Sequence, residues 1–590
     1  MGNRATTEWY LGLDWNGRGL AATLAQHPQG SLHPLVWHQD HHNHAPCHTR
    51  YPLQLSKCEP GTVESEMVER VNLESSGFSP TTTPLTLTQL YPHLRRALPF
   101  YHRRQQQWHP QIQLPLPGAD GSDGSPCSLL TLRQGLQHVL QQVLPTVNPA
   151  VRAQRLSAMD FQAAIQDLAG IVVICPAAWG ATYRFNLREA LLETGLVTAP
   201  DQVLCVAGPL AIALAHQAQT LAAGEIVVRS RDRTALALYT DVAVTEVASW
   251  LESAADTDFL PHQSQSHGYN YGELARQEDL FYQLLYPQWL PHQDFLQAVD
   301  WPFPRIGAAD FPDRDRATLA LSRQAMGSHV LTLARQVLDI LQHRPQVQAQ
   351  LGQQPWQVTQ TQLAETLLPG VTTALNTALN HLLSRQGQTS LQIRQLLWQP
   401  TAWQGLAPLL APWLQRKFPQ ARLVAVTARV ADGLALLPRF PASLNPQTHQ
   451  YDDYFVLREV LQALERSTTV DDSPNPISLN QVCQRLRQRG FNAQDCRDRI
   501  AALLRGQAIP GLIPDAEDPW LSPESQAIVD YRALRAAALF TPHPERPGYF
   551  HWDARQRRRL LQYLDRLQLA SRQSSQDPLL LPWQALEPAF

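Results

Sequence analysis

The sequence is poor in lysine and in charge of either sign. Only 17% of its 590 residues are charged, and Lys57 and Lys417 are its only lysines, so its basic side chains are almost all arginines. The formal net charge of −3 gives no overall attraction to nucleic acid or to an anionic membrane. No apolar run approaches the roughly 18 residues of a membrane-spanning helix, and the start of the chain is unlike a secretory signal. We therefore expect no membrane span.

Cysteine is scarce and has no metal-binding or redox spacing. The chain has seven cysteines, an odd number, and none of them forms a CxxC pair. Cys175 and Cys205 lie inside apolar, strand-like runs, which is typical of buried thiols. These features favour a reducing compartment over a disulfide-stabilised fold, and we expect a cytoplasmic protein.

The length of the chain is too great for one hydrophobic core and indicates several domains. We expect a first unit over residues 1–224, with a variable insertion at about 26–130, and a second unit over residues 225–440. A polar, proline-bearing linker follows, and residues 451–590 are expected to form a mostly α-helical C-terminal domain.

The most regular block of the first unit alternates strands with helices. Strands are predicted at Ile171–Cys175 and Val203–Val206, and helices at Thr182–Thr194 and Leu210–Ala222. Gly195 follows the first of these helices at the position where glycine commonly ends a helix. This alternation predicts an α/β fold with parallel strands.

The second unit shows the same alternation of strands and helices. A hairpin is predicted from residues 226–228 and 235–239, with its turn at Arg229–Thr234. Further on, strands at Leu391–Trp398 and Arg422–Val426 alternate with helices at Trp403–Phe418 and Val430–Leu437. We therefore expect a two-lobed α/β body.

Several short motifs occur in the order found in one known family. They are Leu11-Gly-Leu-Asp14, Val172-Val-Ile-Cys-Pro176, Val206-Ala-Gly-Pro209, Gly268-Tyr-Asn-Tyr-Gly272 and Val430-Ala-Asp-Gly433. Over residues 8–440 the chain thus resembles the nucleotide-binding domain of the seventy-kilodalton heat-shock chaperones, the DnaK-like branch of the actin and sugar-kinase superfamily. The resemblance implies a two-lobed, actin-like ATPase fold that holds ATP or ADP with Mg²⁺ between its lobes.

In that fold, each lobe offers a glycine-rich hairpin whose backbone N–H groups approach the phosphates, and an aspartate of each hairpin orients Mg²⁺. The resemblance assigns the nucleotide contacts to a small set of residues, namely Asp14, Gly17, Gly19, Thr234, Gly272 and Gly433. Catalytic candidates are Asp14 and Thr234, with Asp232 as a replacement for the missing second carboxylate.

Several family residues are replaced. The first loop reads Asn16-Gly17-Arg18 instead of Gly-Thr-Thr, and the second reads Arg229–Thr234 instead of Asp-x-Gly-Gly-Gly-Thr. Because phosphoryl transfer depends on these groups, we expect a pseudo-ATPase that acts as a noncatalytic scaffold or chaperone-like assembly factor for protein partners. The alternative is a divergent ATPase that still binds and hydrolyses ATP.

Two further clusters carry alternative chemistry. The histidines His38, His41, His42, His44 and His48 are metal-ligand types, but their spacing matches no structural zinc pattern. In the C-terminal domain, two consecutive helices resemble a helix-turn-helix unit, in which Arg485, Arg489 and Arg497 are placed to meet phosphates. A nucleic-acid-binding regulator is therefore a second alternative, although Asp495 and Asp498 interrupt the basic surface.

Overall fold

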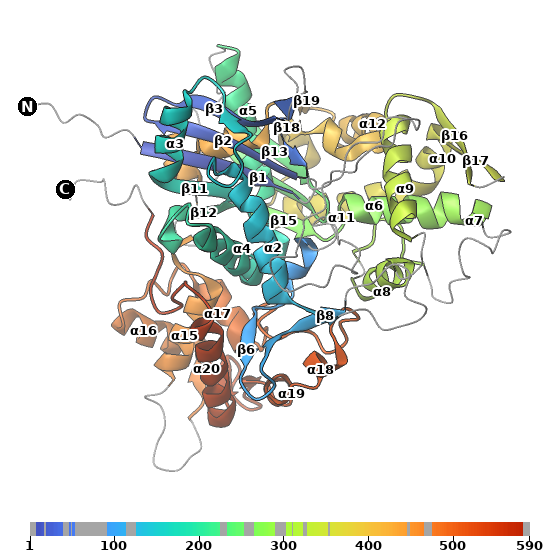
Figure 1. The fold of residues 1–590 in the computed structure, drawn as a ribbon. Helices are drawn as coiled ribbons and strands as arrows, with labels where there is room; N and C mark the ends of the chain where they lie inside the picture. Colours follow the sequence, from blue (N-terminus) through green and yellow to red (C-terminus); the bar gives the residue numbers. More distant parts are fainter. Residues whose placement is uncertain are drawn as a thin grey trace, which may run out of the picture.

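The computed structural model describes residues 8–16, 19–38, 47–48, 50–52, 91–113, 126–224, 233–252, 265–289, 303–309, 311–322, 327–351, 354–444, 449–464 and 475–581. Within these residues the protein is a mixed α/β structure (Figure 1). Two large sheets form its upper part, and a C-terminal region lies below the first of them.

The first sheet joins an antiparallel hairpin to parallel strands. Its strand order is β10–β3–β2–β1–β11–β12, and β1 runs antiparallel to β2 but parallel to β11. The short strands β4 (Cys47–His48) and β5 (Tyr51–Pro52) pair with β3 and β2. The main strands are β1 (Glu8–Trp15), β2 (Gly19–His27), β3 (Ser31–His38), β10 (Val151–Ala153), β11 (Leu168–Ile174) and β12 (Val203–Val206). Strand β3 therefore extends the sheet into the stretch that we expected to be a variable insertion.

The second sheet repeats this arrangement. Its order is β15–β14–β13–β18–β19, with β13 antiparallel to β14 and parallel to β18. The strands are β13 (Arg233–Thr240), β14 (Thr245–Glu252), β15 (Gln265–Tyr269), β18 (Ile393–Trp398) and β19 (Arg422–Ala425). Each sheet thus begins with a hairpin and ends with two parallel strands. In the first sheet these two strands are almost fully buried and accordingly apolar.

The structure corrects the end of the turn that we expected at Arg229–Thr234. Arg233 and Thr234 lie in β13 and pair with β14, so they are not turn residues, whereas residues 225–232 lie outside the described residues. The turn between β13 and β14 is at residues 241–244. Thr234 is a β-branched residue with a buried side chain, and it fits a strand better than a turn.

Two helices pack together between the sheets. Helix α5 (Gly208–Ala222) follows β12, and α13 (Val430–Ala435) follows β19. A Cβ atom on Gly433 would stand 2.2 Å from the backbone nitrogen of Ala215 in α5, so the helices meet backbone to backbone. Gly12 of β1 faces α13 as closely, since its Cβ would stand 2.3 Å from the carbonyl oxygen of Ala431.

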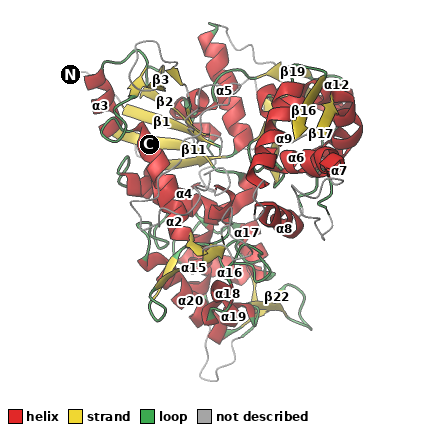
Figure 2. Ribbon diagram, turned by 45° about the vertical axis from the view of Figure 1, so that its right-hand side comes forward, coloured by secondary structure: helices red, strands yellow, loops and turns green. Residues whose placement is uncertain are grey.

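Other helices lie beside the two sheets, and those of the C-terminal region lie below the first one (Figure 2). Helices α2 (Leu129–Leu140) and α4 (Gly180–Thr194) contribute to the apolar core of the first sheet. Gly195 ends α4 in the left-handed conformation, as its position in the sequence predicts. The core of the second sheet is formed with α6 (Glu273–Leu280), α9 (Gly327–Leu341), α11 (Leu368–Arg385) and α12 (Ala407–Lys417).

The C-terminal region is mainly helical but also contains a small sheet, which its sequence pattern does not predict. The strands β20 (Ile477–Ser478), β21 (Phe540–Pro542) and β22 (Tyr549–Trp552) are two to four residues long, too short to show strand periodicity. The helices are α15 (Asp453–Ala463), α16 (Leu479–Gln488), α17 (Arg497–Leu504), α18 (Pro523–Gln526), α19 (Val529–Arg535) and α20 (Ala554–Leu569).

The C-terminal region is bonded to helix α4 of the first sheet. The hydroxyls of Thr182 and Tyr454 lie 2.8 Å apart, and the buried carboxylate of Glu189 accepts the backbone N–H groups of Arg572 and Gln573. Phe100, from the stretch before α2, lies in the same apolar cluster as residues of α15 and α20. These contacts attach the C-terminal region to the rest of the fold. None of the helices in the described ranges is long and apolar enough to cross a membrane.

Candidate functional site

A polar cavity of about 280 Å³ lies between the two sheets. The carboxyl ends of β1, β13, β18 and β19 meet there, the usual position of ligand sites in α/β folds. Its lining includes Asp14, Asn16, Arg50, Tyr239, Asp241, Glu273, Thr401 and Arg429. The cavity therefore brings together the turns that follow the first strand of each sheet.

The first turn is occupied by an arginine side chain. Arg50 forms an ion pair with Asp14, whose side chain is only 4% exposed. The same guanidinium donates to the side-chain oxygen of Asn16 at 2.9 Å and to the carbonyl oxygen of Gly19 at 3.0 Å. Arg50 thus joins the end of β1 to the start of β2 and supplies a positive charge beside Asp14.

The second turn is closed by its own aspartate. Asp241 accepts the backbone N–H groups of Ala243 at 2.7 Å and Val244 at 2.8 Å through one carboxylate oxygen. Its other oxygen accepts the hydroxyl of Tyr239 at 3.2 Å. Both oxygens of this buried carboxylate are therefore bonded within the hairpin, as in an Asx turn.

Helix α6 holds the second turn in place. The backbone N–H groups of Glu273 and Leu274 donate to the carbonyl oxygens of Asp241 and Val242, each at 2.9 Å. Gly272 permits this contact, because a Cβ atom there would stand 2.4 Å from the backbone nitrogen of Ala243. The first N–H groups of α6 are thus directed to protein carbonyls.

Behind the second turn, Glu246 of β14 connects the two sheets. Its fully buried carboxylate accepts the N–H of Ala177, at 2.5 Å, and that of Gly208, at 3.0 Å, both from segments that follow strands of the first sheet. Burial raises the pKa of Glu246 to about 7, although these backbone hydrogen bonds act in the opposite direction.

The residues predicted from the sequence lie at different places. Asp14 borders the cavity, and Gly19 contributes its carbonyl oxygen to Arg50. Thr234 does not line it, because it lies six residues before Thr240 along β13, roughly 20 Å away at the rise of a strand. Gly272 and Gly433 lie in close contact with the backbone of other segments. Gly17 and Asp232 lie outside the described residues.

Sequence reasoning missed Arg50 and Asp241. Asp241 had a detectable signal, because it follows an apolar strand as Asp14 does at the end of β1. Arg50 had no such signal in the sequence. It is 36 residues away from Asp14, and it follows the histidine-rich stretch, in which no helical or strand periodicity is visible.

The histidine cluster is only partly described. His38 ends β3, and His48 lies in β4, whereas His41, His42 and His44 lie outside the described residues. Among the residues that the structure describes, no group of three or more histidine, cysteine or acidic side chains is arranged to hold a metal ion.

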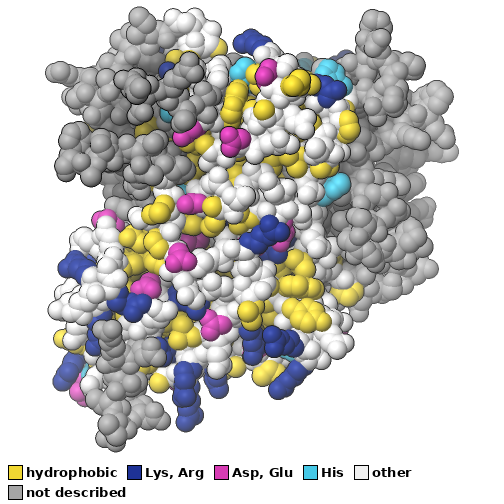
Figure 3. All heavy atoms as spheres, turned by 60° about the vertical axis from the view of Figure 1, so that its left-hand side comes forward, with side chains coloured by type: hydrophobic (Ala, Val, Ile, Leu, Met, Phe, Trp, Pro, Cys, Tyr) yellow, Lys and Arg dark blue, Asp and Glu magenta, His cyan; other side chains and the backbone are white. Residues whose placement is uncertain are grey.

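The arginines of the predicted helix-turn-helix unit contact protein groups. Arg489 donates to both carboxylate oxygens of Glu459, Arg485 donates to the carbonyl oxygen of Ala463, and Arg497 donates to Asn480. On the face in Figure 3, groups of arginine side chains are separated by acidic and apolar side chains. These three arginines therefore stabilise the C-terminal region itself.

Comparison of the chain with protein-family models gives no match, and comparison with curated proteins gives none either.

Proposed function

We propose that this protein is a noncatalytic, heat-shock-chaperone-like scaffold with an actin-like, two-lobed architecture. In this proposal each sheet belongs to one lobe, and the cavity between them is the remnant of a nucleotide site. The C-terminal region and the lobes together offer surfaces for partner proteins.

The repeated strand order supports the architectural part of the proposal. In both sheets an antiparallel hairpin is followed by two parallel strands, and one helix from each half packs at the centre. Such a repeat places two hairpin turns opposite each other, which is the geometry that a phosphate site between two lobes needs.

The single observation that carries the noncatalytic part is the position of Arg50. Its guanidinium lies on the carboxylate of Asp14, the group that the family resemblance assigns to Mg²⁺. An arginine there neutralises the aspartate, and it supplies no ligand to a metal ion, because it has only donors.

The second turn fits a magnesium nucleotide no better. Both oxygens of Asp241 are already bonded, and the turn continues as Val242-Ala243-Val244, which contains no glycine. Side chains at these positions keep phosphate oxygens from the backbone N–H groups. We therefore assign no step of ATP hydrolysis to these residues.

A thermal-melt titration with ATP and ADP, with and without Mg²⁺, tests this function. A ligand that binds only the folded state raises its stability by about 2.7 kcal/mol at a hundredfold excess over Kd. We expect no Mg²⁺-dependent rise in the melting temperature of the wild-type protein at millimolar nucleotide.

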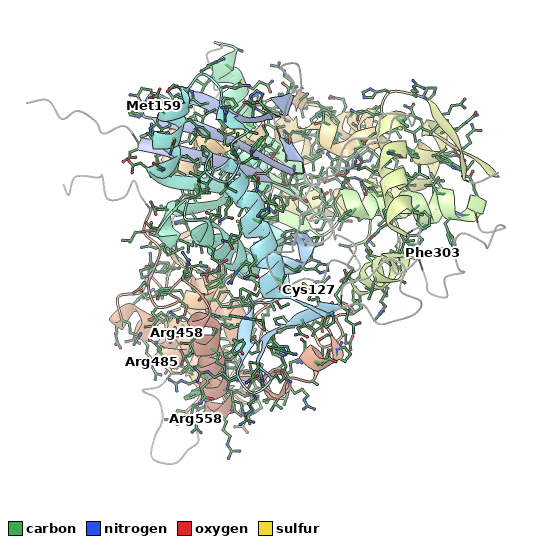
Figure 4. All side chains as sticks on the ribbon, in the orientation of Figure 1. Cys127, Met159, Phe303, Arg458, Arg485 and Arg558 are labelled. Carbon is green, nitrogen blue, oxygen red and sulfur yellow. The ribbon has the colours of Figure 1, made fainter. Side chains whose placement is uncertain are left out.

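Two variants make the test specific. Arg50→Ala removes the guanidinium from Asp14, and Arg558→Ala removes an exposed arginine on α20 that extends away from the body of the protein (Figure 4). A Mg²⁺-dependent rise in wild type that is lost in Asp14→Asn would contradict the proposal and favour the divergent ATPase. A rise confined to Arg50→Ala would support it, because it would show that this arginine blocks the site.

A further inference from the structure

A second cavity lies away from the site between the sheets. It has a volume of about 880 Å³, within the range of pockets that hold small organic ligands. Its walls come from residues near Arg95 and Trp179, from α8 (Phe311–Ser322), and from the C-terminal region. The lining is mostly apolar and includes Leu457, Leu503, Ile509, Leu512, Leu534 and Leu560.

Two of the three arginines in the wall are fully engaged by protein groups. Arg96 forms ion pairs with Asp315 of α8 and Asp518 of the C-terminal region, and it also donates to His93. Arg95 stacks over the ring of Trp179, with its guanidinium carbon 5.5 Å from the ring centre. These two side chains hold the walls together.

The third arginine, Arg535 at the end of α19, differs from the other two. It forms no ion pair among the described residues, and its Nε donates to the carbonyl oxygen of Tyr531, at 3.2 Å. One of its terminal nitrogens is buried without a hydrogen-bond partner. Leaving a charged donor unpaired in this way costs free energy that a bound acceptor would restore.

An unpaired acceptor lies at the same end of α19. Gln556 of α20 is 3% exposed, and its amide nitrogen donates to the carbonyl oxygens of Ala533 and Ala537. Its amide oxygen is buried without a partner. The cavity wall therefore carries an unpaired cationic donor and an unpaired acceptor at one end of the same helix, bordered by the partly exposed segment 537–539.

We propose that this cavity binds an anionic amphiphile whose head carries a carboxylate next to an N–H group, the chemistry of an N-acyl amino acid. The carboxylate accepts from Arg535, the N–H donates to Gln556, and the acyl chain packs on the leucine-rich walls.

The acidic residues of the cavity have partners or face water, which reduces their repulsion of an anionic head group. Asp315 and Asp518 share the single positive charge of Arg96, and Asp515 and Glu517 are exposed to water, which screens them. Among the three arginines of the wall, only Arg535 has a buried terminal nitrogen without a hydrogen-bond partner, and this nitrogen is the donor that we assign to the anion. This inference does not depend on the proposed scaffold function, since the cavity shares no lining residue with the site between the sheets.

Calorimetric titration of the full chain tests the proposal with four probes that share a ten-carbon chain, each kept below its micelle-forming concentration. The probes are N-decanoylglycine, decanoate, decanol and decyltrimethylammonium. We expect affinity to fall in that order. Loss of a charge-assisted hydrogen bond is expected to weaken binding about tenfold or more, so Arg535→Met should reduce the affinity for both acids without changing that for decanol.

Gln556→Met separates the two head-group contacts. This substitution should lower the affinity for N-decanoylglycine to that for decanoate, which has no N–H group to donate. Arg532→Met is the matched control, because Arg532 lies on the same helix, is exposed, and does not line the cavity. Ala538→Phe, a change at an exposed lining residue, should reduce the affinity for all four probes.

Three results would overturn the proposal. One is the absence of saturable binding by N-decanoylglycine, and another is equal affinity for the anionic and cationic probes. The third is an equal effect of Arg535→Met and Arg532→Met. Thermal melts of each variant without ligand show whether a loss of binding comes from unfolding instead. The affinities of the wild-type protein for the four probes still test the proposal if every variant is unstable.

Discussion

The two turns that border the site between the sheets stabilise their aspartates in different ways. At the first turn, Asp14 is paired with Arg50, a residue brought in from a distant part of the chain. At the second, Asp241 is satisfied by two backbone N–H groups and a tyrosine of the same hairpin. At equivalent positions of the two sheets, a buried carboxylate is thus stabilised by a long-range ion pair in one case and by local hydrogen bonds in the other.

This difference indicates which turn should lose more stability when a residue is substituted. A carboxylate that depends on a separate arginine is left uncompensated when that arginine is removed. A carboxylate bonded inside its own turn retains its partners as long as the hairpin forms. We therefore expect the two turns to respond unequally to substitution, and single-residue variants test this inequality, from the largest expected effect to the smallest.

The largest effect is expected where both turns rest on close backbone contacts. A Cβ atom on Gly12 would stand 2.3 Å from the carbonyl oxygen of Ala431, and one on Gly272 would stand 2.4 Å from the nitrogen of Ala243. Because backbone cannot move aside cheaply, Gly12→Ala and Gly272→Ala should each reduce the free energy of unfolding by about 3 kcal/mol or more. Denaturant unfolding measures this change.

Gly490→Ala is the control for these two substitutions. Gly490 also has no side chain and adopts a positive φ of 83°, but a Cβ atom added to it would have no neighbour within 4 Å. Its replacement should cost only about 1 kcal/mol of conformational strain. Equal losses at all three glycines would mean that the turns are not held by backbone contact.

The sequence predicts the repeating parts of this fold better than its site. The strands at β11, β12, β18 and β19 and the helix ended by Gly195 follow from apolar periodicity and local end signals. The turn at 241–244 is not predicted, because Val242-Ala243-Val244 is apolar and looks like part of a strand. Arg50 is unpredictable from local sequence, since its role arises only when β5 pairs with β2.

The next largest effect concerns the connection between the sheets behind the second turn. Glu246 has a pKa of about 7 in the folded protein, against an ordinary value of 4.5, because burial disfavours its charged form. The folded state therefore binds more protons than the unfolded state between about pH 4.5 and 7. The contribution of Glu246 to stability is fully present below that window and is lost as the pH rises through it, by about 3 kcal/mol at most.

Glu246→Gln should flatten this part of the pH dependence. The amide still accepts from Ala177, but it leaves the N–H of Gly208 without an anionic acceptor, a cost that does not change with pH. The slope of unfolding free energy against pH is therefore the informative quantity. Glu545→Gln, at an exposed position, should leave the slope unaltered. An unchanged slope in Glu246→Gln would refute the prediction.

A smaller effect is expected at the first turn. Arg50→Met leaves the buried carboxylate of Asp14 without its cation and should cost about 1–3 kcal/mol, nearer the lower value because a third of the Arg50 side chain is exposed to water. Adding Asp14→Asn should recover part of that loss, because it removes the uncompensated charge. A double-mutant cycle measures the coupling, with Arg558→Met as the exposed control. Strictly additive losses would show that the ion pair contributes nothing to stability.

The smallest effect is expected at the second turn. In Asp241→Asn the remaining carbonyl oxygen can still accept from Ala243 and Val244, while the new amide can donate to the hydroxyl of Tyr239. We expect a loss below about 1 kcal/mol, since the turn keeps its hydrogen bonds. Denaturant unfolding of Asp241→Asn beside Arg50→Met therefore compares the local and the long-range arrangement directly. A larger loss in Asp241→Asn would contradict this expectation and would mean that the negative charge of Asp241 is itself needed at the second turn.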